Sequence, residues 1–205
     1  MALHHLPIVG LCGGGGTLSP ERAKLAHDIG ATVARLGAHL LLSASFSVAE
    51  AAAEGFSAVS PRRGIVLGNI ARDGLGGYDR ACCAADGTPY SSRCVELAMF
   101  TAVKDLEMPR TEERSRVNVL TCDAVVALPG WVGTRLDIDM AAGRDARIGK
   151  RLPMILLAGP GEEFPQELRA MCRHAADAAA VQAQLCRGLS GLGFFLTMHE
   201  QAPAH

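Results

Sequence analysis

Short apolar runs alternate along the chain with longer segments in which apolar residues recur every three or four positions. The short runs, such as Ile8–Cys12, have the length and composition of buried strands, and the longer segments have helical periodicity. This pattern predicts strands at 8–12, 39–42, 65–67, 124–128 and 154–157. It predicts helices at 20–36, 47–55, 92–103, 111–121, 134–146 and 166–187. Ser19 and Pro20 are residue types preferred at a helix start.

The order of these elements predicts an α/β fold. Strands that alternate with helices form a parallel sheet with helices on both faces, and right-handed crossovers wind it into a doubly wound, Rossmann-like arrangement. We expect a single such nucleotide-binding domain over residues 1–187, followed by a C-terminal tail at 188–205. The stretch 69–90 has no regular pattern, and loops of that length are usually functional or mobile.

Composition narrows the function classes. The chain has 205 residues, 49% of them hydrophobic, and a net charge of −1, which argues against binding nucleic acid by phosphate neutralisation. No apolar run approaches the roughly 20 residues that span a bilayer, and no secretory signal is visible. The seven cysteines have no metal-binding spacing. We therefore expect a cytoplasmic protein with reduced thiols, no bound metal, and no nucleic-acid or membrane partner.

Three glycine- or serine-rich turns follow predicted strands, at 13–17, 43–47 and 129–134. The carboxyl ends of parallel strands share one edge, where ligands of doubly wound folds bind. The third turn lies in 123–143, DAVVALPGWVGTRLDIDMAAG, where a buried strand leads through glycines into a helix start. Glycines let backbone N–H groups approach a ligand, and a helix N-terminus attracts anions, so this stretch is a candidate phosphate site.

The candidate ligand-binding residues all lie in these turns: Gly13, Gly14, Gly15, Ser43, Ser45, Gly130, Trp131, Gly133 and Thr134. The first turn is no P-loop, because the lysine of that motif is absent. It serves either to approach a phosphate or sugar or simply to connect strand and helix. Thr134 and Asp137 have the spacing of a helix cap, which is compatible with Thr134 also holding a phosphate while Asp137 faces the ligand.

Few residues near this edge are candidates for catalysis. Asp137 is one, whereas Asp139 lies two positions on and points to another face of the predicted helix. Arg114 and Arg116 diverge for the same reason, so at most one of them reaches the site. Trp131, the one tryptophan, is placed to stack on a ligand ring, to act as a lid or interface anchor, or to pack against neighbouring loops.

The segment 114–141, RSRVNVLTCDAVVALPGWVGTRLDIDMA, resembles the LOG-like superfamily. That group includes nucleoside monophosphate phosphoribohydrolases and molybdenum-cofactor carrier proteins, and its signature is PGGxGTxxE with an arginine upstream. The matching residues are Pro129, Gly130, Gly133 and Thr134, with Asp137 at the glutamate position and Arg114 at the arginine. The sequence that flanks these residues is most similar to the carrier-like branch. The resemblance covers residues 7–160 and implies a Rossmann-like fold that binds a phosphorylated ligand.

The chain departs from the family pattern at several positions. Trp131 replaces the second glycine, Asp137 replaces a longer glutamate, and Ser115 replaces the lysine that follows the arginine in the hydrolase branch. The second turn, 43–47, is SASFS where the family has a run of glycines. These differences weaken the case for hydrolysis more than the case for ligand binding, because serine hydroxyls also bind phosphate.

Two hypotheses of function follow. In the first, the protein carries a phosphorylated nucleotide-like or molybdopterin-type ligand, and Trp131 covers its ring. In the second, it is a phosphoribohydrolase that cleaves the N-glycosidic bond of nucleoside 5′-monophosphates, with Asp137 and Arg114 as catalytic residues. No cofactor is certain beyond such a ligand. By analogy with the family we also expect a homodimer, with a predicted apolar helix at 91–104 as its contact.

Overall fold

The computed structural model describes residues 5–14, 17–43, 48–72, 94–102, 110–130, 132–148, 154–160 and 163–196. Within them the strands are β1 Ile8–Cys12, β2 His39–Ser43, β3 Val66–Arg72, β4 Leu97–Ala102, β5 Ala124–Ala127, β6 Met154–Ala158 and β7 Arg173–Ala175. The helices are α1 Pro20–Arg35, α2 Val48–Ser57, α3 Arg110–Thr121, α4 Val132–Ile148, α5 Gln166–Met171 and α6 Ala178–Gly191. None of these helices is long and apolar enough to cross a bilayer.

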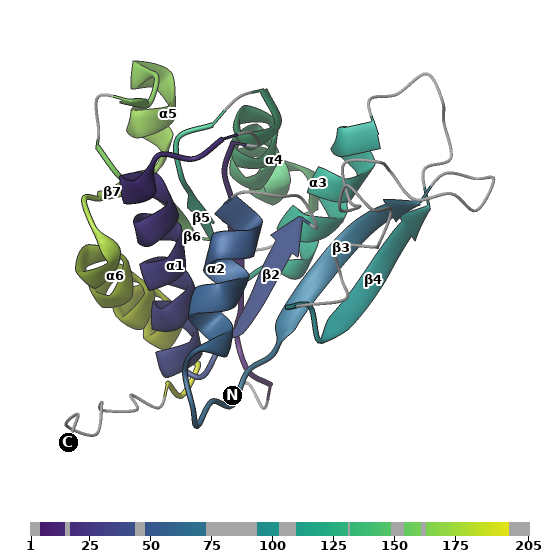
Figure 1. Cartoon of the computed structure of the whole chain (residues 1–205). Helices are drawn as coiled ribbons and strands as arrows, with labels where there is room; N and C mark the ends of the chain where they lie inside the picture. The colour runs from purple at the N-terminus through teal and green to yellow at the C-terminus, as the bar shows by residue number, and fades with distance from the viewer. Residues whose placement is uncertain are drawn as a thin grey trace.

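All of these strands join one parallel sheet in the order β4-β3-β2-β1-β5-β6-β7. Helices α1, α2 and α6 cover one face, and α3 and α4 cover the other (Figure 1). Successive residues of β2 enter different cores, because Leu40 and Leu42 pack toward α1 and α2 whereas Leu41 packs toward α3 and α4. A sheet buried on both faces explains the continuous apolar runs. The predicted α/β, Rossmann-like fold is confirmed.

The chain changes its direction of winding beside β1. This strand pairs with β2 on one side, where Ile8 lies opposite His39, and with β5 on the other, where Val9 lies opposite Ala124. After β1 the chain enters α1 on one face of the sheet, and after β5 it enters α4 on the opposite face (Figure 1). In doubly wound folds the crevice between two such diverging connections is where ligands bind.

Local signals set the ends of α1 as the sequence predicts. The Ser19 hydroxyl accepts a hydrogen bond from the Arg22 backbone N–H (3.3 Å), and Pro20 is the first helical residue. Gly37 follows the helix with φ of 72°, a conformation that glycine adopts without strain. The chain then enters β2, which pairs in parallel with β1.

The helix predicted at 92–103 is wrong, because residues 97–102 form the edge strand β4. This strand pairs in parallel with β3, with Leu67 opposite Leu97 and Asn69 opposite Met99. Hydrogen bonding to a distant segment outweighs the helix propensity of a Leu-Ala-Met sequence. The expected dimer contact through a helix at 91–104 therefore loses its basis in the described part of that segment.

The single long helix predicted at 166–187 is also wrong. The structure divides this segment into α5, the short strand β7 and α6. Strand β7 extends the sheet by pairing with β6, where Arg173 lies opposite Leu156. Asp177 then caps α6, because its carboxylate accepts a hydrogen bond from the Ala180 N–H (2.8 Å). Helix α6 continues past Arg187 to Gly191.

Helices α1 and α2 approach each other so closely that only glycine fits at two contact points. A Cβ atom on Gly30 would lie 1.9 Å from the Ala52 carbonyl oxygen, and one on Gly55 would lie 1.9 Å from the His27 carbonyl oxygen. We predict that Gly30→Ala lowers the free energy of unfolding by about 1–3 kcal/mol, because the helices must separate. Urea unfolding measures the change. The control is Gly191→Ala, whose Cβ meets nothing within 4 Å, and equal losses in both variants would contradict this packing.

Candidate functional site

The segments that follow β1 and β5 meet at the carboxyl edge of the sheet. The Leu128 N–H donates to the Cys12 carbonyl oxygen (2.9 Å). This hydrogen bond holds the two segments together just before they diverge. Two residues further on, a Cβ atom on Gly130 would lie 2.6 Å from the Gly14 backbone nitrogen and 2.1 Å from Thr134 Oγ1. Only glycine fits at position 130. We call the group of Gly14, Gly130 and Thr134 the cradle.

Thr134 supplies the one side chain of the cradle. It is 6% exposed, and its Oγ1 has no hydrogen-bond partner among the described residues. Helix α4 begins at Val132, so Thr134 is its third residue and not the N-cap that the spacing predicts. At that position it lies among the first-turn N–H groups, which have no partner within a helix and carry the positive end of its dipole. An anion would satisfy both kinds of donor.

Asp137 lies one turn after Thr134 on the same face of α4 and is 8% exposed. Its Oδ1 has no hydrogen-bond partner within the described residues. Burial raises the pKa of Asp137, and hydrogen bonds with Ser115 and Cys12 together with the charge of Arg114 offset only part of that rise. The carboxyl group therefore keeps its proton to a higher pH than an exposed aspartate does.

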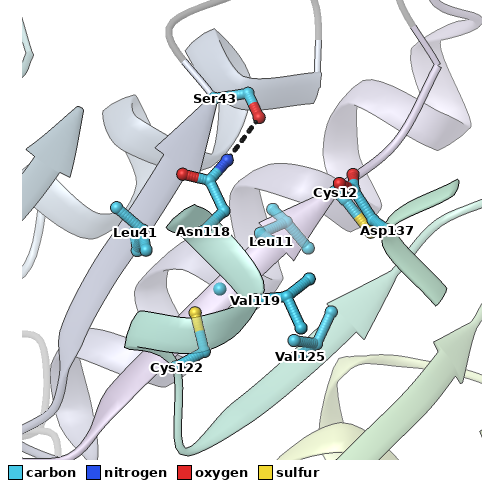
Figure 2. Close-up of a pocket in the computed structure, with 10 residues that line it drawn as sticks. Leu11, Cys12, Leu41, Ser43, Asn118, Val119, Cys122, Val125 and Asp137 are labelled. Atoms are coloured by element: carbon cyan, nitrogen blue, oxygen red, sulfur yellow. Dashed lines mark hydrogen bonds between the residues drawn. The ribbon is translucent and has the colours of Figure 1, made fainter. Parts of the chain in front are cut away.

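Cys12, the last residue of β1, faces Asp137 (Figure 2). Burial and the neighbouring Asp137 carboxylate raise the pKa of the Cys12 thiol, which hydrogen bonds to that carboxylate. A thiol with a raised pKa is a poor nucleophile. Cys12 therefore acts as a donor that orients Asp137, together with the buried Ser115, which stands where the hydrolase branch has lysine.

A chain of hydrogen bonds fixes α3 against three strands. The Thr101 hydroxyl donates to Asn69 Oδ1 (2.6 Å), and Asn69 is fully buried. Asn69 Nδ2 donates to Asn118 Oδ1 (2.8 Å). Asn118 Nδ2 in turn donates to Ser43 Oγ (2.8 Å), as Figure 2 shows. Since Asn69 Nδ2 also reaches the Arg114 carbonyl oxygen (3.4 Å), the network positions the turn of α3 that faces Asp137.

A small cavity of about 20 Å³ lies between α3 and the sheet. Its lining includes the polar residues Ser43, Asn118 and Asp137 and the apolar residues Val119 and Val125, all of which Figure 2 draws. This volume suits one water molecule. The cavity is therefore too small for a ligand, and it belongs to the packing beneath α3.

The two catalytic candidates, Arg114 and Asp137, lie near each other in the structure. Arg114 lies close enough to Asp137 for its charge to lower the pKa of that carboxyl group. Arg116 is exposed. Asp139 also points away, and its carboxylate lies 3.5 Å from the Arg135 guanidinium.

The predicted ligand-binding residues have different environments. Gly14, Gly130 and Thr134 form the cradle, and Gly133 lies in the first turn of α4. Gly13 instead allows close packing on α2, because a Cβ there would lie 2.9 Å from Val48 Cγ1. Ser43 belongs to the hydrogen-bond network under α3. Three predicted residues lie outside the described part of the chain: Gly15, Ser45 and Trp131.

Sequence reasoning missed the network of Asn69 and Asn118 and the contact of Cys12 with Asp137. One signal was available, since an asparagine between the apolar residues of the strand VLGNIAR has to find partners when it is buried. The partner of Cys12 could not be foreseen, because 125 residues separate the two side chains along the chain.

A family model described as the SLOG cluster4 family matches residues 6–181. The chain belongs to this family. The match includes the cradle, Arg114 and Asp137, and it runs from β1 into α6. It agrees with the LOG-like resemblance of the segment 114–141. Among proteins with curated descriptions, none matches the chain.

Several solved structures share the fold. The molybdenum cofactor binding protein of Rippkaea orientalis is 19% identical, with a TM-score of 0.65 over 92% of this chain and 99% of that chain. The molybdenum cofactor carrier protein of Chlamydomonas reinhardtii is 20% identical, with a TM-score of 0.65 over 91% and 99%. DNA processing protein A of Helicobacter pylori, described with a single-stranded DNA binding mode, is 12% identical, with a TM-score of 0.62 over 88% and 80%. The absence of a nucleic-acid partner therefore stays a prediction for this chain.

We predict that Asp137→Asn stabilises the folded protein increasingly as pH rises. The pKa of Asp137 is raised on folding, so its favourable contribution is complete below the unfolded value of about 4 and is lost as pH rises through the folded value. An amide has no charge to bury and still accepts hydrogen bonds from Ser115 and Cys12. Thermal unfolding from pH 4 to pH 8 should show the Tm difference, variant minus wild type, becoming more positive.

The matched control is Asp139→Asn, which removes a carboxylate from the exposed side of the same helix. A pH trend as large as that of Asp137→Asn, or no trend in Asp137→Asn, would contradict this account of the buried carboxyl group.

Proposed function

We propose that this protein binds a phosphorylated small molecule at the carboxyl edge of its sheet and acts as a carrier for it. The phosphate would lie in the cradle, against the Gly14 N–H, the Thr134 hydroxyl and the first-turn N–H groups of α4. Gly130 lets the Gly14 N–H and the Thr134 hydroxyl come close together, because any side chain there would collide with both groups.

One observation carries the proposal, namely the Thr134 hydroxyl that is buried beside backbone donors and has no hydrogen-bond partner among the described residues. Leaving a buried polar group unsatisfied costs about 1–3 kcal/mol. A phosphate oxygen would accept from the Thr134 hydroxyl and the Gly14 N–H together, and the helix dipole would favour its charge. A bound anion thus recovers the energy that the unsatisfied Thr134 hydroxyl costs.

The ligand class follows from the resemblance of 114–141 to the carrier-like branch, and two structural neighbours are described as a molybdenum cofactor binding protein and a molybdenum cofactor carrier protein. We infer a phosphorylated nucleotide-like or molybdopterin-type ligand, with any metal it holds as part of the cargo. A homodimeric state, by analogy with the family, and a cytoplasmic location, expected from cysteines that read as reduced thiols, belong to the same proposal.

A second candidate function is cleavage of the N-glycosidic bond of a nucleoside 5′-monophosphate. The observation in its favour is the buried Asp137 Oδ1, which has no partner in the described chain and lies near the Arg114 charge. Such cleavage uses an ionised carboxylate to stabilise positive charge on the sugar. The raised pKa of Asp137 disfavours that ionised form. Binding without turnover is therefore the better-supported function.

We predict that Thr134→Val separates binding from stability. The variant keeps the side-chain shape but loses the hydroxyl, so inorganic phosphate should bind about tenfold more weakly, as expected for a lost hydrogen bond to a charged group. The Tm should stay the same or rise, because a buried unsatisfied hydroxyl disappears. Calorimetric titration in a phosphate-free buffer measures the first change, and thermal unfolding measures the second.

Gly130→Ala is the steric counterpart, and it should abolish phosphate binding because its Cβ would lie 2.1 Å from Thr134 Oγ1. Gly191→Ala, far from the cradle, is the control and should bind phosphate as the wild type does. Wild-type phosphate affinity in both Thr134→Val and Gly130→Ala would remove the cradle as the binding site.

Incubation with a panel of nucleoside 5′-monophosphates distinguishes the two functions. We expect no release of free base and ribose 5-phosphate, because burial disfavours the ionised form of the Asp137 carboxyl group and the aspartate lacks the glutamate's length. Turnover that Asp137→Asn abolishes, while Asp139→Asn retains it, would overturn the carrier function in favour of the hydrolase.

A further inference from the structure

A second and larger cavity lies between the first turns of α4 and the segment 163–168, which leads into α5. Its volume is about 160 Å³. It differs from the small cavity under α3, with which it shares no lining residue. Two of its lining residues, Gly130 and Thr134, belong to the cradle. We call this cavity the α4–α5 pocket.

The floor of the α4–α5 pocket is apolar. Ile138 of α4 contributes to it from one side, and Phe164 and Leu168 contribute from the other. These three side chains are 0%, 4% and 4% exposed and belong to the same hydrophobic core. Because the core holds them, the floor is set before any ligand binds, and an apolar surface placed on it would gain burial at little cost in ordering.

The rim of the pocket carries charges that are already balanced. Glu163 pairs with Arg22 of α1, with 2.8 Å between guanidinium nitrogen and carboxylate oxygen. Arg135 lies 3.5 Å from the Asp139 carboxylate and 3.7 Å from the Glu167 carboxylate. A charged occupant would disturb these pairs, whereas an uncharged group with an apolar face would leave them intact.

The size of the pocket limits its occupant to about one ring. Its 160 Å³ is close to the roughly 150 Å³ of an engineered apolar cavity that binds benzene. Pockets for whole drug-sized ligands start at about 300 Å³. Gly130 and Thr134 line the pocket and also belong to the cradle, so an occupant of the pocket lies next to an anion in the cradle.

We propose that the α4–α5 pocket binds the ring that is joined most closely to the phosphate of the ligand. This inference rests on the proposed phosphate site in the cradle and deepens it. It assigns the ligand to the phosphate monoesters of ring-bearing alcohols, and it makes open-chain phosphate esters poor ligands. The ring lies on Ile138, Phe164 and Leu168, and its phosphate reaches Thr134 and the Gly14 N–H.

Calorimetric titration with inorganic phosphate, ethyl phosphate and phenyl phosphate tests the inference on the full chain. Phenyl phosphate should bind about tenfold more tightly than ethyl phosphate, because the ring buries additional apolar surface. Leu168→Phe fills the pocket from its floor, and Pro165→Trp fills it from its exposed rim. Either variant should lose the advantage of phenyl phosphate and keep the affinity for inorganic phosphate. Pro165→Trp keeps the test valid if Leu168→Phe does not fold.

The matched control is Ala170→Phe, which adds the same ring to an exposed position of α5 that does not line the pocket. It should retain the full preference for phenyl phosphate. Equal binding of phenyl and ethyl phosphate by the wild type, or a preference that survives in Pro165→Trp, would overturn the ring pocket while leaving the cradle intact. Failure of the wild type to bind inorganic phosphate would instead overturn the proposed function itself.

Discussion

The pairing of β1 with two parallel neighbours is the constraint on which the site depends. Strands β2 and β5 hold β1 in the middle of the sheet, and the hydrogen bond from Leu128 to the Cys12 carbonyl fixes where the chains leave it. From that point the segment after β1 leads to α1 and the segment after β5 leads to α4, on opposite faces of the sheet (Figure 1). The crevice between them brings Gly14 against Gly130, although 116 residues separate them along the chain.

Buried polar groups at this edge oppose stability and favour binding. The Thr134 hydroxyl and one oxygen of Asp137 are buried without partners in the described chain, which a protein selected for stability alone would avoid. Both belong to one face of α4, one turn apart. The residues around Asp137 differ from those of the hydrolase pattern. Ser115 stands at the position of a lysine, and Asp137 is shorter than the glutamate of the pattern. Here Ser115 and Cys12 orient a buried carboxyl group.

The elements that the sequence predicts correctly have local causes. Strands β1 and β5 are buried on both faces and show continuous apolar runs, and α1 begins at Ser19 and Pro20 with its cap formed. The errors fall on β4 and β7, edge strands whose residues also suit helices and whose partners lie elsewhere in the chain. The glycines of the turns also act locally, and they mark the position of the cradle in the sequence.

The surroundings of the cradle depend on contacts between distant segments, and the sequence does not predict them. Asn69 and Asn118 meet across α3 and β3, and Cys12 meets Asp137 across β1 and α4. The α4–α5 pocket exists because the segment 163–168 folds back as α5 before β7, whereas its periodicity suggests one uninterrupted helix. A local pattern of apolar residues cannot report where such a segment returns to the sheet.

Amide chemical shifts of ¹⁵N-labelled protein during a titration with inorganic phosphate test the central claim most directly. If the cradle holds the anion, the Gly14 N–H and the first-turn N–H groups of α4 should shift together and saturate with one affinity, and Gly130→Ala should remove these shifts. Saturable phosphate binding that leaves the Gly14 and α4 amides unshifted would contradict the account.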